Sequence, residues 1–165
     1  MSVSKKIVLL GHFGVGKSSL LRRYVENTFS ENYTVTIGVH IMKKEVILSN
    51  GGVTLIIWDV EGTDDFTQYR SSYLLGASSF VYVFDASRAV TYSDLKYNMD
   101  HLQDKFPGTS VHIVGNKVDL VDEKELMKDL EAQGIKHSYL SSAKTGKNVE
   151  LLFEDIAAQL LKHAK

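Results

Sequence analysis

The sequence predicts an α/β fold of three layers, in which a six-stranded, mostly parallel sheet with one antiparallel edge strand is covered by five helices. Short apolar runs alternate with segments of helical periodicity, which is the pattern of a parallel sheet with crossover helices. Two strand-like segments are joined by the turn signal SNGG at 49–52, which predicts a hairpin. The length of 165 residues, 44% of them hydrophobic, suits a single domain over 1–165.

Each element follows from its local pattern. Residues 6–10 form a continuous apolar run, as in a strand buried on both faces, and residues 17–25 have helical spacing. Residues 27–38 have no steady period, which predicts a long loop. The other strands are predicted over 39–48, 53–59, 79–85, 111–116 and 136–141, and the other helices between 59 and 79 and over 91–105, 122–133 and 149–161. Ligands of such sheets bind beyond the carboxyl ends of the strands, so candidate site residues are sought there.

Composition and charge exclude several classes of protein. The 19 Lys and Arg residues against 20 Asp and Glu give a net charge of −1, which argues against a general nucleic-acid binder. Apolar runs are too short for a membrane-spanning helix. Cysteine is absent, which excludes disulfides, thiolate metal sites, a Cys nucleophile and a thioether lipid anchor in this sequence.

The first predicted strand leads into a phosphate-binding motif. Residues 11–18 are GHFGVGKS, with two glycines separated by four residues and followed by Lys and Ser. Such a loop curls so that backbone N–H groups and the following helix N-terminus hold a phosphate. We expect Lys17 to neutralise the terminal phosphates and Ser18 to bind Mg²⁺. The nucleotide-binding residues predicted here are Gly14, Val15, Gly16, Lys17, Ser18 and Ser19.

The third predicted strand ends in a candidate metal residue. Asp59 follows an apolar run and suits an indirect Mg²⁺ ligand opposite Ser18. The N–H of Gly62 would approach the terminal phosphate. Taken alone, Asp-x-x-Gly also fits an ordinary turn at the end of a strand, so this interpretation depends on the neighbouring motifs.

The fifth and sixth predicted strands are followed by residues suited to guanine. The carboxylate of Asp119, in the sequence NKVD at 116–119, can accept hydrogen bonds from the ring N–H and the exocyclic amine of guanine. Adenine would leave that carboxylate unpaired, which is costly. In Ser142-Ala143-Lys144 a small residue would let a backbone N–H reach the guanine oxygen, although this triplet alone also fits a plain loop.

Together these motifs resemble the Ras superfamily of small GTPases over nearly the whole chain, and most closely its Rab branch. The segments YTVTIGV at 33–39 and YLLGA at 73–77 are similar to Rab sequences. The resemblance implies a P-loop NTPase fold of the Ras type and GTP or GDP bound with Mg²⁺ as cofactor. It also implies that the candidate base and switch residues from the family pattern are Phe29, Tyr33, Thr36, Asn116, Lys117 and Asp119.

Several of these residues have an alternative interpretation. The resemblance implies that Thr36 closes on Mg²⁺ and the γ-phosphate, and that Phe29 and the stem of Lys117 sandwich the guanine. Phe29 could instead be a core aromatic, and Thr36 a turn residue. Trp58 is either a core residue or part of the surface that binds effectors.

The sequence departs from the family at the catalytic position. The catalytic set implied by the resemblance is Lys17, Thr36, Gly62 and Thr63. Thr63 stands where the family has the glutamine that orients the attacking water, and it is shorter and lacks the amide. Phe13 stands where the family prefers a small residue, and its ring could crowd the γ-phosphate or block an arginine finger.

Slow hydrolysis is therefore expected, although Rab-type activators can supply both Arg and Gln. Glu61 and Asp64 could hold the water instead, or be solvated loop charges. His12 replaces the common Rab Asp and is expected to be exposed in its loop.

The leading hypothesis is a cytoplasmic, Rab-like GTPase switch. Its loops around 30–41 and 60–76 would bind effector proteins, an exchange factor and a GTPase-activating protein, and it would bind no nucleic acid. One alternative is a hydrolysis-impaired GTP-binding interaction module, and another is an ATP-using P-loop kinase. Because the sequence has no cysteine, membrane association would require a further tail or a partner.

Overall fold

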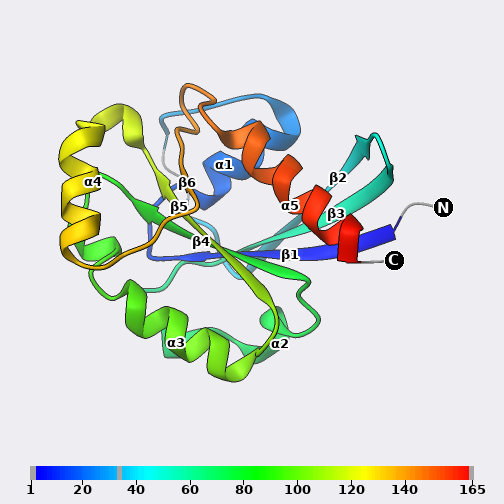
Figure 1. Cartoon of the computed structure of the whole chain (residues 1–165), viewed down its shortest axis with the longest axis horizontal. Coiled ribbons are helices and arrows are strands. Elements are labelled where there is room, and N and C mark those ends of the chain that lie inside the picture. Colours follow the sequence, from blue (N-terminus) through cyan, green and yellow to red (C-terminus); the bar gives the residue numbers. More distant parts are fainter. Residues whose placement is uncertain (1–2, 33–34, 164–165) are drawn as a thin grey trace.

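The computed structural model describes residues 3–32 and 35–163, and it places one sheet between two layers of helices (Figure 1). The six strands have the order β2-β3-β1-β4-β5-β6. Their bounds are Val3–Gly11 for β1, Val39–Leu48 for β2, Gly51–Val60 for β3, Ser79–Asp85 for β4, Ser110–Asn116 for β5 and Tyr139–Leu140 for β6. Only β2 and β3 pair in antiparallel fashion among these strands, which confirms the predicted fold class.

Five α-helices cover the sheet in the described part of the chain. They are α1 (Lys17–Glu26), α2 (Ser71–Leu74), α3 (Leu95–Lys105), α4 (Glu123–Ala132) and α5 (Val149–His163). In Figure 1, α1 and α5 lie on one side of the sheet and α2 and α3 on the other. Single 3₁₀ turns lie at Phe66–Gln68, Ala89–Thr91 and Val118–Leu120.

Two predicted elements are shorter than expected. The helix predicted over 91–105 begins only at Leu95, because a separate 3₁₀ turn precedes it. The strand predicted over 136–141 contains two residues, since only Tyr139 and Leu140 pair with β5. The helix predicted between 59 and 79 is the four-residue α2.

The core explains why the strands are apolar on both faces. Ile7 and Leu9 of β1 pack in a cluster with residues of α1 and α5, whereas the alternate residues Val8 and Leu10 pack with residues of α2 and α3. A strand buried on both faces has no polar alternation, as the run at 6–10 predicts. The ends of the parallel strands meet at one edge, where β1 stops at Gly11 and β5 at Asn116.

Candidate nucleotide-binding site

A cleft of about 290 Å³ lies at the carboxyl ends of the strands. Its walls come from the loop after β1, the long loop after α1 and the loops that follow β3, β5 and β6. The lining residues are Phe13, Gly14, Gly16, Lys17, Ser18, Ser19, Arg22, Phe29, Ser30, Glu31, Asn32, Val35, Thr36, Gly62, Asn116, Lys117, Asp119, Leu120, Ala143 and Lys144. The structure therefore brings most of the predicted site residues together.

Two glycines shape the phosphate-binding end of this cleft. Gly16 has a φ of 99°, and a Cβ there would lie 2.3 Å from the side-chain nitrogen of Asn116. A Cβ on Gly62 would lie 2.9 Å from the carbonyl oxygen of His12 and 3.0 Å from Lys17 Nζ. Only glycine allows this close approach of the backbone, so both positions fit the roles predicted for them.

Lys17 is a buried cation in the cleft. It begins α1 and is only 6% exposed. Burial lowers the pKa of Lys17 to about 8, although the carboxylate of Asp59 opposes the shift. A desolvated ammonium group in a cleft is suited to a polyanionic ligand such as a phosphate chain.

Three oxygen-bearing side chains converge beside Lys17. Ser18 Oγ lies 2.7 Å from Thr36 Oγ1 and donates to Oδ2 of Asp59, and Thr36 Oγ1 is 3.5 Å from the same carboxylate oxygen. Burial raises the pKa of Asp59, although Ser18 and Lys17 oppose the shift. Oδ1 of Asp59 is buried and accepts no hydrogen bond from any described residue. A hard oxygen cluster with an unsatisfied buried carboxylate oxygen fits Mg²⁺.

The end of the cleft that is predicted to bind the base is held together by side-chain hydrogen bonds. Asn116 Nδ2 donates to the Val15 carbonyl at 3.0 Å, and Asn116 Oδ1 accepts from Ala143 N–H at 3.1 Å. The hydroxyl of Ser142 donates to Asp119 at 2.7 Å and orients the exposed carboxylate. The amide of Ala143, in the triplet expected to contact guanine, thus has a protein partner in this structure.

Lys117 connects the two ends of the cleft. Its ammonium donates to the Gly14 carbonyl at 2.7 Å and lies 3.0 Å from Oδ2 of the buried Asp85. The side chain therefore runs along the cleft floor toward the phosphate loop. This leaves its aliphatic stem available to a flat ligand.

Helix α1 also supports the base-binding loop. Arg23 donates from Nε to the Ala143 carbonyl and from Nη2 to the Lys144 carbonyl, both at 2.7 Å. The ammonium of Lys144 lies 2.8 Å from Glu31 Oε1, which links the two sides of the cleft mouth. No feature of the local sequence marks Arg23 or Glu31 as part of the site, because their partners are more than 110 residues away.

The aromatic side chains at the cleft are placed differently from one another. Phe29 lines the cleft and also packs against the core cluster under α1 and α5. It is therefore both a cleft residue and a core aromatic. Phe13 is 41% exposed and lines both the cleft and a neighbouring hollow. Trp58 is half-buried, with the Lys6 ammonium 3.7 Å from its ring centre. Tyr33, predicted to bind nucleotide, lies outside the described residues.

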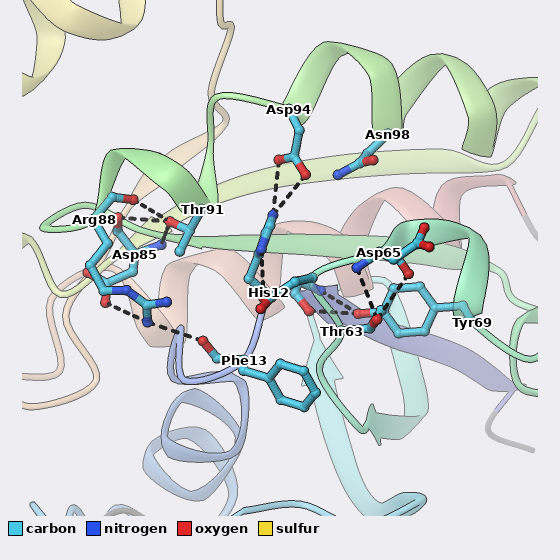
Figure 2. Close-up of polar contacts among 12 residues, drawn as sticks. His12, Phe13, Thr63, Asp65, Tyr69, Asp85, Arg88, Thr91, Asp94 and Asn98 are labelled. Carbon is cyan, nitrogen blue, oxygen red and sulfur yellow. Dashed lines mark hydrogen bonds and ion pairs between the residues drawn. The ribbon is translucent and has the colours of Figure 1, made fainter.

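Thr63 does not line the cleft. It lines the neighbouring hollow, and its hydroxyl donates to the Asp65 carbonyl and accepts from the Asp65 N–H (Figure 2). The two candidate water-binding carboxylates also have protein partners, since Glu61 accepts from Gly38 N–H and Asp64 contacts His12.

Two other predicted residues, Val15 and Ser142, lie behind the lining of the cleft. They support it through Asn116 and Asp119.

The expectation that His12 is an exposed loop residue was wrong. Its ring is buried, with 5% of the residue exposed, between Asp64 and Asp94. The physical reason is that each ring nitrogen faces a carboxylate from another part of the chain. Neither contact could be predicted from the local sequence, because the partners are 52 and 82 residues away.

No helix in residues 3–32 and 35–163 is long and apolar enough to cross a membrane.

Comparisons with known proteins agree with this geometry. The model of the Ras family matches residues 6–162. Ras-related protein Rab-1 of Theileria annulata is 37% identical over 94% of this chain and 73% of its own length. Ras-related protein Rab-22A of Homo sapiens is 37% identical over 94% of this chain and 82% of its own length. The Ypt/Rab-type GTPase YPT7 of Saccharomyces cerevisiae is 33% identical over 95% of this chain and 81% of its own length.

The family match covers nearly all of the sequence, and members of this family bind GTP and GDP with Mg²⁺. The site described above has the residue types that such binding requires. The chain therefore belongs to the Ras family and is a Rab-like GTP-binding switch.

Proposed function

We propose that this chain binds GTP and GDP with Mg²⁺ in the cleft, hydrolyses GTP slowly and signals by binding effector proteins. One observation carries the proposal. One end of a single cleft holds the buried ammonium group of Lys17 and the oxygen cluster around Ser18 and Asp59. The other end holds the carboxylate of Asp119, which Ser142 orients. The separation of these features suits a phosphate chain at one end and a base at the other.

At the phosphate end, the backbone N–H groups of 14–19 hold the phosphates. Lys17 neutralises their charge, and the N–H of Gly62 approaches the terminal phosphate. Ser18, Thr36 and Asp59 would hold Mg²⁺, directly or through water. When bound, that ion supplies positive charge to the phosphate oxygens.

At the base end, Asp119 accepts hydrogen bonds from guanine and is left unpaired by adenine. Phe29 and the stem of Lys117 provide apolar surfaces for the two faces of the base. Lys144 and Ala143 close this end, held in place by Arg23. This arrangement disfavours the alternative of an ATP-using kinase, since a carboxylate left unpaired would oppose adenine.

Slow hydrolysis follows from the position of Thr63. Hydrolysis of this type depends on positioning the water and stabilising charge, and the Thr63 hydroxyl is occupied by the Asp65 backbone. The same observation favours the second candidate, a hydrolysis-impaired interaction module. A single-turnover measurement separates the two, because the module would leave bound GTP intact until a partner supplies the missing groups. A rate equal to that of a relative with glutamine at this position would contradict slow hydrolysis.

Partners would bind over the loops at 30–41 and 60–76. Exposed apolar side chains gather there, with Ile37 86%, Leu75 61%, Val35 52% and Ile41 44% exposed. Effectors, an exchange factor and an activating protein would use these side chains. We place the protein in the cytoplasm, with membrane association supplied by a partner or by a further segment.

The nucleotide that copurifies with the protein tests the proposal. Denaturing the purified protein and separating the released nucleotides should give guanine nucleotides in a ratio near one per chain, with a substantial fraction as GTP. Lys17→Met should reduce this content strongly while leaving the fold intact by circular dichroism. Adenine nucleotides in the pocket, or failure to take up added GDP with Mg²⁺, would contradict the proposal.

A further inference from the structure

His12 joins three segments that are distant in the sequence (Figure 2). It belongs to the loop after β1, and its Nδ1 lies 2.9 Å from Oδ1 of Asp64, in the segment after β3. Its Nε2 lies 2.9 Å from Oδ2 of Asp94, the residue before α3. The ring itself is buried, with 5% of the residue exposed.

The Asp94 contact replaces an ordinary helix cap. Asp94 occupies the N-cap position of α3, but its side chain accepts no capping hydrogen bond from the described helix amides. Aspartate at this position normally accepts from the backbone N–H groups of the first turn. The carboxylate instead faces His12, so the ring has a fixed anchor on the body of the domain.

A tyrosine provides a second attachment for the same segment. The buried hydroxyl of Tyr69 donates to the Gly11 carbonyl at 2.7 Å and accepts from the Gly11 N–H at 2.9 Å. The N–H of Thr63 also donates to the Gly11 carbonyl, at 3.3 Å. Residues 63–69 are therefore attached at both ends to the phosphate loop. We call His12, Tyr69 and the backbone of Gly11 the latch.

The two contacts of the His12 ring differ in their exposure to water. A ring nitrogen that carries a hydrogen donates to the carboxylate that it faces, and such a bond to a charged acceptor is stronger than a bond between neutral groups. The Asp64 side chain is 68% exposed and Asp94 only 34%, so the Asp64 bond is the one that opens toward water.

We propose that His12 is a positioning residue that holds 63–69 against the phosphate loop. The inference rests on the proposed nucleotide binding and extends it. The latch also keeps Thr63 bonded to Asp65 and out of the cleft, which is consistent with slow hydrolysis.

Hydrogen exchange of a peptide covering 63–70 tests the latch. Exchange of the wild-type protein is measured with GDP and Mg²⁺ bound. His12→Gln keeps a donor near the Nε2 position and removes the one facing Asp64. It should speed exchange of 63–70 about tenfold, as expected when a hydrogen bond to a charged group is lost.

Matched variants separate positioning from general stability. His12→Asn keeps a donor near the Nδ1 position, so it should retain most of the protection that His12→Gln loses. Asp64→Asn changes an exposed side chain that cannot disturb the core, and it should act in the same direction as His12→Gln. Asp104→Asn removes an exposed charge from α3 and should leave 63–70 unchanged.

Two results would overturn the latch. One is equal exchange of 63–70 in His12→Gln and His12→Asn. The other is unchanged exchange there in both His12→Gln and Asp64→Asn. The variants are also compared in nucleotide-free protein, and GDP affinity is titrated separately. A failure of the proposed function would therefore abolish GDP binding without altering the difference between His12→Gln and His12→Asn.

Discussion

At the level of single residues, Thr63 sets the expected rate of GTP hydrolysis. Its hydroxyl is bonded to the Asp65 backbone and it lines a hollow beside the cleft. A glutamine side chain is longer and carries both a donor and an acceptor, so it can reach a water that threonine cannot.

We therefore expect Thr63→Gln to raise the single-turnover rate of GTP hydrolysis, by about tenfold to a hundredfold if water positioning is limiting. Thr63→Val keeps the size of the side chain and removes the hydroxyl, and it should leave the rate unchanged. Rates are measured with preloaded GTP and Mg²⁺. A Thr63→Gln rate equal to that of the wild type would mean that another group already positions the water.

Single residues also show where sequence reasoning succeeds and where it stops. Lys17, Ser18, Asp59 and Asp119 could be assigned roles from their residue type and their place after predicted strands. Contacts among distant segments could not be assigned in this way. His12 was misjudged for this reason, since its burial depends on two carboxylates that only the folded chain brings to it.

At the level of elements, α1 supports the base-binding loop through Arg23. Its guanidinium donates to two successive carbonyls, those of Ala143 and Lys144. This loop forms one wall of the proposed guanine site, so its rigidity should control how fast nucleotide leaves.

Arg23→Gln should speed GDP release severalfold, because loss of two charge-assisted hydrogen bonds loosens the loop. Release is followed with a fluorescent GDP analogue chased by excess GDP. Lys128→Gln removes a similar charge from the solvated face of α4 and serves as the control, with no expected change. Equal release rates in the wild type and Arg23→Gln would show that α1 does not restrain the loop.

The elements themselves were largely predictable, because long apolar runs and helical stripes reflect burial. The helix predicted over 149–161 is α5, and the helix predicted over 122–133 is α4, most of whose charged residues are exposed. The bounds of short elements were not predicted, because α2 has four residues and is too short to show a period. The two-residue β6 is defined by its pairing with β5, which the local sequence does not specify.

For the whole molecule, stability depends on the two core layers that flank the sheet. Phe153 of α5 is fully buried and stacks on Tyr24 of α1, with ring centres 4.3 Å apart. This pair joins the two helices that cover one face of the sheet.

Phe153→Ala should lower the free energy of unfolding by about 3–5 kcal/mol, since it removes a large buried side chain and leaves a cavity. Denaturant titration of the nucleotide-bound protein at fixed GDP concentration measures the change. Leu151→Ala, on the same helix but 48% exposed, should cost much less. Similar losses for the two variants would contradict the assignment of Phe153 to the core.

The choice between guanine and adenine nucleotides tests the central claim most directly. Nucleotide-free protein is titrated with GDP and with ADP, each with Mg²⁺, in the same buffer. The account predicts that GDP binds at least about a hundredfold more tightly, because ADP leaves the Asp119 carboxylate unpaired. Equal affinities for GDP and ADP would contradict it.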